Sequence, residues 1–547
     1  MSDVMIPIPF QQLLTWMVAE FQTEGSVFGI PEEKFYFKND TAAMTVFGET
    51  CETPIGPAAG PHTQVAQNLA AAYLTGGRFF ELKTVQIMDE LEIEKPCIDA
   101  ERETYNTEWS TELTVPQAYD EYIKAWFLIH TLQKMFGLSK LKDRAFVFNM
   151  SVGYDLEGIK SPKIDNFIEG LKDASQEPIF QECQRMLREA VEAGDLPGIT
   201  SADFVEQISS SISHSVTLST MHGTPPEDQE EICKYLMAEK GLHTYVKLNP
   251  TLHGYEYVQG VFDDLGYEHI HLREESFTHD MQYPAAVEML HNLLDHAEQN
   301  GVEFGVKLSN TLAVVNDQGT LPCDEMYMSG RALYPLTVNL AEKLSREFNG
   351  ELTISYSGGA DVFNITELLR AGLKPITMAT YLLKPGGYAR MTQLAQMLED
   401  ELEALHSDRV NLDSLARTAE QSLRDPRYAY EGKSPAPMKT DGSLPLLDCF
   451  LAPCTDGCPI HQDIPEYIRL IGEERYADAY RLITAKNPLP FITGYICDHK
   501  CQLKCVRNDY EAPVQIRDLK HIAAEKGYDE VIETIHPPET RREKQVA

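Results

Sequence analysis

The chain has 547 residues, of which 43% are hydrophobic and 24% are charged, a composition typical of a globular protein with two or three domains. Its formal net charge of −37 opposes binding to nucleic acid or to an anionic membrane and favours basic partners, although an acidic host proteome would explain it equally well. No run approaches the roughly 20 apolar residues of a membrane span, and residues 1–9 lack the features of a signal peptide. We therefore expect a cytoplasmic protein.

The first 50 residues are expected to form an N-terminal extension. Apolar side chains at helical spacing predict a helix over about residues 10–22, and residues 44–48 have the composition of a short strand.

From residue 51 to residue 405, short β-rich runs alternate with amphipathic helical stretches such as residues 116–135 and 330–348. This alternation predicts a parallel sheet covered by helices, and about eight repeats predict an α/β fold, a (β/α)₈ barrel, with a helical insertion near residues 175–211. The candidate strands are residues 53–59, 78–84, 145–151, 215–221, 244–249, 269–273, 303–309, 352–357 and 375–382. These are nine candidates for the eight strands of a barrel, so one of them is not a barrel strand. The sequence does not decide between residues 269–273 and residues 303–309.

The predicted strand ends carry small and basic residues, at the positions where a barrel enzyme builds its active site. The turn Gly56-Pro-Ala-Ala-Gly-Pro61 would let the backbone approach a ligand closely. Gly358-Gly359 and Ala379-Thr380 end two late strands, which predicts a phosphate pocket. Lysines also occur in these strands or at their ends: Lys83, Lys247 and Lys307. Taken singly, a Gly-Gly pair is usually a turn and a strand lysine usually extends to solvent, so the prediction depends on their order along one barrel.

Residues 406–445 are interpreted as a linker region, in which a helix is expected from Asn411 and turn-forming residues with little to bury follow from Ser434 and mark a domain boundary. Residues 446–535 then combine two amphipathic helical faces with six of the eleven cysteines. These cysteines form two triplets: Cys449, Cys454 and Cys458, then Cys497, Cys501 and Cys505.

Three interpretations of the cysteines compete. Disulfides need an oxidising compartment, which nothing in the sequence indicates. Zinc is often bound by two Cys-x-x-Cys pairs, and neither triplet contains that pair. Two separated groups with a Cys-Pro step, Cys458-Pro459, favour an iron–sulfur centre.

Residues 452–465, 487–490 and 494–505 resemble the N-terminal iron–sulfur domain shared by the glutamate synthase small subunit and dihydropyrimidine dehydrogenase. The resemblance implies one or two [4Fe–4S] clusters as cofactors. The ligands of the first would be Cys449, Cys454 and Cys505, and those of the second Cys458, Cys497 and Cys501.

The sequence departs from that pattern at two positions. Leu446 stands where the family has a further Cys, and Lys520 stands where it has a Gln or Glu ligand. Each cluster therefore has three evident ligands, and either a single cluster forms or a fourth ligand comes from a small molecule or another side chain. The candidate side chains are Asp448, Glu511 and Asp518.

In the relatives, a domain that binds an adenine dinucleotide follows this point. Residues 536–547 are interpreted as its start, and the sequence contains no Gly-x-Gly-x-x-Gly fingerprint. FAD and NAD(P)H would then be held by an absent domain or by a partner.

The order of motifs along the barrel resembles the FMN barrel of dihydroorotate dehydrogenase and dihydropyrimidine dehydrogenase. The matching runs are residues 57–61, Lys83-Thr84, residues 246–248, Asn310-Thr311, residues 328–332, residues 357–359 and Ala379-Thr380. The resemblance implies that Ala59 and Gly60 lie against a flavin ring, and that Lys83 with Lys247 or Lys307 places positive charge at its N1/O2 edge. It also implies a role in holding the flavin phosphate for a set of small residues: Gly330, Gly358, Gly359 and Thr380.

The resemblance weakens at the substrate side. The active-site run of the family falls on residues 217–223, where Thr217 replaces an Asn and Thr220 replaces the acid/base Cys or Ser. A threonine hydroxyl is a poor proton donor at neutral pH, which argues against pyrimidine or orotate chemistry. The candidate catalytic residues are Ser219, Thr220 and His222.

A barrel of this kind in front of a cluster domain resembles the selenate reductase subunit family, iron–sulfur flavoproteins associated with molybdenum hydroxylases and purine breakdown. The resemblance implies an oxidoreductase that relays electrons between NAD(P)H-reduced FAD and a barrel FMN or a partner. That partner would be another oxidoreductase subunit, for example one of the molybdenum hydroxylase type, and the substrate would be a small molecule. Two alternatives remain open: an inactive barrel that serves as a docking scaffold, and an enzyme of the dihydropyrimidine or dihydroorotate dehydrogenase type.

Overall fold

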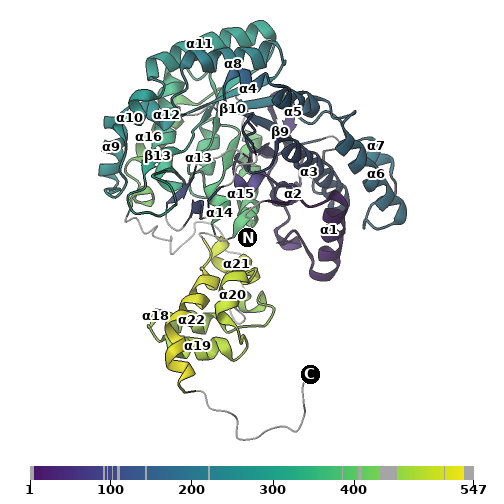
Figure 1. Ribbon diagram of the computed structural model, residues 1–547, viewed down its shortest axis with the longest axis vertical. Coiled ribbons are helices and arrows are strands. Elements are labelled where there is room, and N and C mark those ends of the chain that lie inside the picture. Colours follow the sequence, from purple (N-terminus) through teal and green to yellow (C-terminus); the bar gives the residue numbers. More distant parts are fainter. Residues whose placement is uncertain are drawn as a thin grey trace. The chain divides into compact units, whose positions relative to one another are not determined.

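The computed structural model describes residues 5–89, 93–94, 96–100, 103–107, 111–141, 144–219, 222–384, 386–404, 409–430, 452–509 and 512–534. The chain divides into two compact units, Met1–Pro435 and Ala436–Ala547, each of which is described by itself (Figure 1). Cys449 and Thr220 lie outside the described residues.

The larger unit begins with the predicted helix. Helix α1 (Phe10–Glu24) buries Phe10, Leu13, Leu14 and Met17 and ends at Gly25 in the left-handed conformation. The predicted strand near residue 44 is confirmed as β3 (Met44–Val46), which pairs with β4 (Glu49–Cys51) in an antiparallel hairpin.

Eight parallel strands form the centre of this unit. They are β5 (Ile55–Pro57), β6 (Phe79–Glu81), β9 (Val147–Val152), β10 (Ser215–Leu218), β11 (His243–Leu248), β12 (Phe304–Leu308), β15 (Thr353–Tyr356) and β16 (Ile376–Met378). Their order in the sheet is β5-β16-β15-β12-β11-β10-β9-β6. The two outer strands also meet, because the Arg78 amide donates a hydrogen bond of 2.9 Å to the Ile55 carbonyl. The predicted α/β barrel is therefore confirmed.

One of the nine candidate strands does not form a strand. Residues 303–309 contain β12, whereas residues 269–273 form no strand. Ile270 is instead buried in a second hydrophobic cluster beside the barrel, and the His271 carbonyl accepts a hydrogen bond of 2.9 Å from Val315. An alternating apolar and polar pattern over five residues describes this loop as well as it describes a strand.

Helices cover the outside of the barrel (Figure 1). The predicted helices at residues 116–135 and 330–348 are confirmed as α3 (Val115–Phe136) and α12 (Tyr334–Glu347), the latter after a 3₁₀ turn, Arg331–Leu333. The other long covering helices are α2 (Ala66–Leu74), α5 (Pro162–Lys172), α8 (Pro226–Ala238), α11 (Tyr283–Asn300), α15 (Arg390–Ala404) and α16 (Leu412–Ser422). The segment at 175–211 is helical as predicted and contains α6 (Pro178–Ala193) and α7 (Asp203–Glu206).

A small antiparallel sheet lies beyond the carboxyl ends of the barrel strands. Its order is β13 (Leu312–Val315), β14 (Glu325–Ser329), β8 (Thr104–Asn106) and β7 (Ile98–Asp99). One hairpin follows β6 and the other follows β12, so both belong to the face where barrel enzymes place their sites. Helices α9 (Tyr255–Asp264) and α10 (Glu274–His279) contribute to the hydrophobic cluster under this sheet.

The smaller unit is helical. Its elements are α17 (Pro453–Asp456), α18 (Ile464–Gly472), α19 (Tyr476–Thr484), α20 (Pro490–Ile496), α21 (Lys500–Leu503) and α22 (Ile516–Ile532). Helix α22 packs against α18, α19 and α20, and the two predicted amphipathic helices correspond to α18 and α19.

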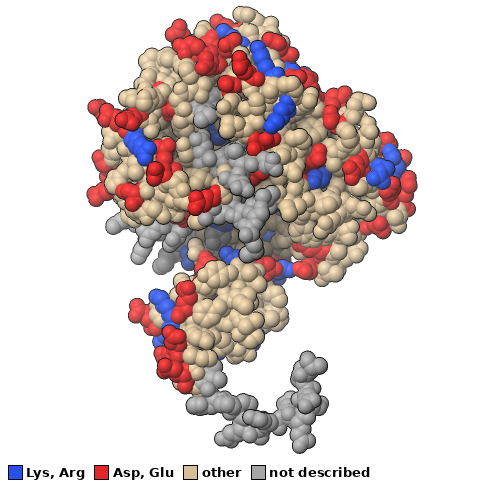
Figure 2. All heavy atoms as spheres, viewed as in Figure 1, with Lys and Arg blue, Asp and Glu red and all other residues tan. Residues whose placement is uncertain are grey.

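Two further properties concern membrane crossing and surface charge. In the described part of the chain, no helix combines the length and apolarity that crossing a membrane requires. On the face drawn in Figure 2, acidic side chains are scattered over the larger unit instead of forming one patch.

Candidate functional site

Three turns that are far apart in the sequence meet in the larger unit. A Cβ atom placed on Gly359, after β15, would lie 2.6 Å from the carbonyl oxygen of Gly330, after β14. A Cβ atom on Gly330 would in turn lie 2.9 Å from the Cγ2 atom of Thr380, after β16. Both glycines have positive φ, 84° for Gly330 and 72° for Gly359, so the position and the conformation each require glycine.

Two neighbouring contacts complete this cradle. The hydroxyl groups of Ser329 and Thr380 are 3.0 Å apart, and a Cβ atom on Gly358 would lie 2.5 Å from Oγ1 of Thr337. Ala379 directly precedes the short helix α14 (Thr380–Leu383). The structure thus brings together the residues that the sequence proposes for a phosphate, and backbone N–H groups at such turns suit an anion.

Lys307 points into the barrel interior, where it has a partner that the sequence analysis did not anticipate. Its side chain is 1% exposed and its ammonium forms an ion pair with Glu81, whose side chain is 5% exposed. The ammonium also donates to the hydroxyl of Thr377 and, over 3.3 Å, to that of Ser355. Burial lowers the pKa of Lys307 to about 8 against the opposing effect of Glu81.

The same carboxylate holds the turn after β5. Glu81 Oε2 accepts a hydrogen bond of 3.2 Å from the backbone amide of Ala59. The buried pair therefore connects the interior of the barrel to the Ala59-Gly60 turn that resembles a flavin contact. The sequence gives no signal for this pair, because spacing cannot pair residues 226 positions apart.

The other two predicted lysines are also at the carboxyl ends of the strands. Lys83 follows β6 and is 7% exposed. Lys247 is in register with Lys307 on the neighbouring strand, and its charge contributes to lowering the pKa of Lys307. Thr84, which follows Lys83, and Asn310, three residues after Lys307, are both half-buried. The Oγ1 atom of Thr84 is 2.7 Å from Oγ of Ser151, and Oδ1 of Asn310 accepts a hydrogen bond of 3.1 Å from the Thr311 amide.

His62 is a site residue that the sequence analysis missed. Its ring lies against the Ala59-Gly60 turn, because a Cβ atom on Gly60 would be 2.8 Å from its Cε1 atom. Burial lowers the pKa of His62 to about 4, and the positive charge of Lys83 acts in the same direction. The imidazole is therefore neutral at pH 7. The only signal in the sequence is its position two residues after Gly60.

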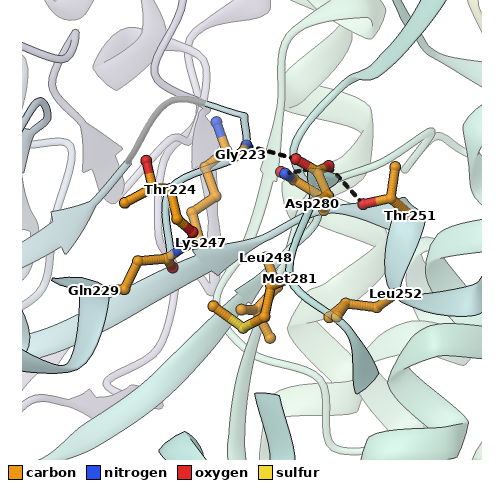
Figure 3. A pocket seen from close by; sticks show the side chains of 10 residues that line it. Gly223, Thr224, Gln229, Lys247, Leu248, Thr251, Leu252, Asp280 and Met281 are labelled. Carbon is orange, nitrogen blue, oxygen red and sulfur yellow. Dashed lines mark hydrogen bonds between the residues drawn. The ribbon is translucent and has the colours of Figure 1, made fainter. Parts of the chain in front are cut away.

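A second group of polar side chains surrounds His222, after β10. The Nδ1 atom of His222 is 3.1 Å from Oδ2 of Asp280, which is 4% exposed. The same carboxylate accepts hydrogen bonds from Thr251 Oγ1 at 2.7 Å, Asn249 Nδ2 at 3.0 Å and the Gly223 amide at 2.7 Å. Figure 3 shows Gly223 and Thr251 converging on Asp280.

The environment of Asp280 keeps it ionised. Burial by itself would raise its pKa, but hydrogen bonding and the charge of His222, with further hydrogen bonds from Thr251 and Gly223, hold the pKa of Asp280 below its ordinary value. An ionised carboxylate at this distance requires a proton on His222 Nδ1. The arrangement is that of a histidine oriented by an aspartate, as a general acid or base needs.

A small hollow adjoins this pair. It is lined by Gly223, Thr224, Gln229, Lys247, Leu248, Asn249, Thr251, Leu252, Asp280 and Met281. Figure 3 shows Lys247 and Gln229 on the side opposite Thr251. The lining combines a lysine side chain, an ionised carboxylate and two side-chain amides.

The other proposed catalytic residues differ in their surroundings. Ser219 is half-buried, and its amide donates to the Val152 carbonyl at 2.9 Å. Thr217 is buried, and its hydroxyl accepts a hydrogen bond of 2.7 Å from Asn149. Thr220 lies outside the described residues.

The described cysteines of the smaller unit gather around one core. Cys454, Cys458 and Cys501 pack in the same hydrophobic cluster. Burial first, and then the sulfurs of Cys458, Cys497 and Cys454, raise the pKa of Cys501 to about 12. Burial and the sulfur of Cys505 raise the pKa of Cys454. These neighbour relations bring the five described cysteines to one site, and because Cys454 acts on Cys501 as well, the division into two groups stays a prediction.

This set of donors fits an iron–sulfur cluster. The thiols of Cys454 and Cys501 resist ionisation until a cation compensates their charge, and iron would supply that charge. Within the described residues, no three His, Cys, Asp or Glu side chains are close enough to bind one metal ion. In a four-iron cluster each thiolate binds its own iron, so this closeness is not needed.

Two protein families match the chain. The family described as oxidoreductase YgfK, N-terminal TIM-barrel domain, matches residues 28–430. The family described as dihydropyrimidine dehydrogenase domain II, 4Fe-4S cluster, matches residues 443–531. The second match supports the iron–sulfur interpretation of the cysteines over zinc and disulfides.

Individual relatives agree with the family matches. YgfK of Escherichia coli (strain K12), a candidate oxidoreductase, is 51% identical over 556 residues, covering 98% of this chain and 53% of YgfK. The chain thus spans about half the length of the curated relatives it matches at this level. The NADPH-Fe(3+) oxidoreductase subunit beta of Geobacter sulfurreducens is 35% identical over 102 residues, 19% of this chain and 15% of that protein.

Among solved structures, ligand-free DHODH from Eimeria tenella covers 74% of this chain and 97% of its own, with 15% identity and a TM-score of 0.40. The family assignment depends on the sequence matches alone. Because the barrel family covers most of the chain and a four-iron-cluster domain follows it, this protein belongs to the YgfK-like oxidoreductases.

Proposed function

We propose that the chain is the iron–sulfur flavoprotein part of an electron-transfer oxidoreductase. One observation carries the proposal: a single chain joins a barrel, whose strand ends form a glycine cradle and a His–Asp pair, to a helical unit that concentrates thiols in one core. FMN would supply hydride and single-electron chemistry, and the clusters would carry single electrons. NAD(P)H and FAD would belong to a further domain or to another oxidoreductase subunit.

The residues of the barrel have distinct roles in this proposal. Gly330, Gly358, Gly359 and Thr380 would hold the flavin phosphate through backbone N–H groups and a hydroxyl. Ala59 and Gly60 would face the ring, and Lys83 and Lys247 would place positive charge at one edge of it.

His222 would exchange a proton with the substrate, and Asp280 would keep its ring in place and its Nδ1 protonated. Lys247, at the hollow beside this pair, would also attract an anionic or carbonyl oxygen of a small-molecule substrate. Selenate or a purine derivative would satisfy this chemistry. Pyrimidine chemistry of the dihydroorotate type is less well supported, because the hydroxyl of Thr217 already accepts a hydrogen bond from Asn149.

One observation favours a second candidate function, a docking scaffold without catalysis. Lys307 already has a carboxylate partner, Glu81, and needs no bound anion. The two candidates differ in what the purified chain contains. The test is to record absorbance spectra of anaerobically purified protein and to measure its content of FMN, iron and sulfide. The electron-transfer function predicts flavin and clusters together, whereas clusters without flavin would support the scaffold.

A further inference from the structure

A buried lysine belongs to the smaller unit. Lys520 on α22 is 6% exposed. Ile516, four residues before it, and Ala523, three residues after it, lie on the same face of the helix. Both pack in the hydrophobic cluster that contains Cys454, Cys458 and Cys501. Lys520 therefore belongs to the face of α22 that covers the cysteines.

Hydrogen bonds fix the first turn of α22 to the second cysteine triplet. The backbone amide of Arg517 donates to Oε1 of Gln502 at 3.2 Å, and Gln502 directly follows Cys501. The guanidinium of Arg517 donates to the carbonyl of Cys497 at 3.4 Å. The position of Lys520 relative to these cysteines is thus set by the backbone as well as by packing.

Lys520 differs from other buried lysines of the chain in its partners. Lys38 pairs with Asp40 at 2.6 Å, Lys124 with Glu121, and Lys307 with Glu81. No carboxylate among the described residues forms an ion pair with Lys520, whereas its charge acts on the thiol of Cys501. A buried ammonium needs a compensating anion, and the cysteine sulfurs would supply that negative charge once they bind iron as thiolates.

We propose that Lys520 is the counter-charge of the cluster bound by Cys458, Cys497 and Cys501 and raises the reduction potential of that cluster. The inference rests on one part of the proposed function, namely that these cysteines bind a cluster. A thiolate-bound cluster gains one negative charge when it takes up one electron, and a nearby cation stabilises the more negative state. No bond forms or breaks in this role.

Redox titration followed by EPR tests this role in the full chain, purified anaerobically. Lys520→Met removes the charge and keeps most of the stem, and Lys520→Arg keeps the charge. Lys526→Met is the matched control, because Lys526 lies on the same helix but is exposed and its ammonium is 3.3 Å from the hydroxyl of Tyr476. A Cys501→Ser variant identifies the signal of the second cluster by its loss.

At a fixed solution potential, Lys520→Met should lower the ratio of reduced to oxidised second cluster about tenfold, which corresponds to about 59 mV for one electron. In Lys520→Arg and Lys526→Met, this ratio should stay close to that of the unchanged protein. Iron loss in Lys520→Met that Lys520→Arg prevents would also support the counter-charge. An unchanged potential with intact clusters, or iron loss in both Lys520 variants, would overturn it. Absence of clusters from the unchanged protein would instead refute the proposed function.

Discussion

The carboxylate of Asp280 lies 3.1 Å from Nδ1 of His222, although 58 residues separate them in the sequence. Four donors from two segments, His222 and Gly223 after β10 and Asn249 and Thr251 after β11, surround that carboxylate, so its ionised state is built into the fold. This pair places a histidine oriented by a carboxylate at the carboxyl ends of the barrel strands.

We predict that Asp280→Asn destabilises the larger unit by about 1–3 kcal/mol at pH 7, because it weakens several buried hydrogen bonds to a charged group. The pKa of Asp280 is lowered in the folded state, so its contribution is complete above the ordinary value of about 4 and disappears as the pH falls through the lower folded value. Urea unfolding at several pH values should therefore show the difference shrinking below about pH 4.

Asp317→Asn is the control for this measurement. Its partner His271 is 57% exposed and Asp317 is 41% exposed, so the loss should be at most about 1 kcal/mol. A difference for Asp280→Asn that does not change with pH would contradict the assignment of an ionised carboxylate.

We predict that Gly359→Ala abolishes flavin binding. The added Cβ atom would lie 2.6 Å from the carbonyl of Gly330 and would force the cradle apart. Gly194→Ala is the matched control, because Gly194 has a similar φ of 75° and its Cβ atom would meet nothing within 4 Å. FMN content after desalting should fall only in Gly359→Ala; equal loss in both variants would mean that backbone strain, not the cradle, is responsible.

We predict that Lys307 and Glu81 are strongly coupled. Lys307→Met leaves a buried carboxylate without its cation and should cost about 3–5 kcal/mol. Adding Glu81→Gln should recover part of that loss, because the uncompensated charge is gone. Denaturant unfolding of both single variants and the double variant measures the coupling, and strict additivity would show that the pair does not interact.

We predict that the cysteines act as two groups. Cys505→Ser should remove the cluster that involves Cys454 and leave the one that involves Cys501, which halves the iron content if both form. Cys323→Ser is the control, because Cys323 is a free cysteine outside the smaller unit. Iron and sulfide analysis decides between the outcomes, and loss of both clusters in Cys505→Ser would show that they assemble as one unit.

The barrel could be predicted because alternation of apolar strands and amphipathic helices is a local pattern. Residues 269–273 show its limit, since a five-residue alternation also occurs in a loop that packs on another sheet. The glycine turns and the cysteine triplets were found for the same reason, as short motifs at element ends. The pairs Asp280–His222 and Glu81–Lys307 depend on which strand ends become neighbours, and only the folded chain supplies that information.

The most direct test of the central claim is the number of electrons that the anaerobically purified chain accepts from dithionite. One FMN takes up two electrons and each four-iron cluster takes up one, so the account predicts roughly three or four electrons per chain, with bleaching of both flavin and cluster absorbance. Uptake of only one or two electrons without any flavin bleaching would contradict a chain that carries both centres.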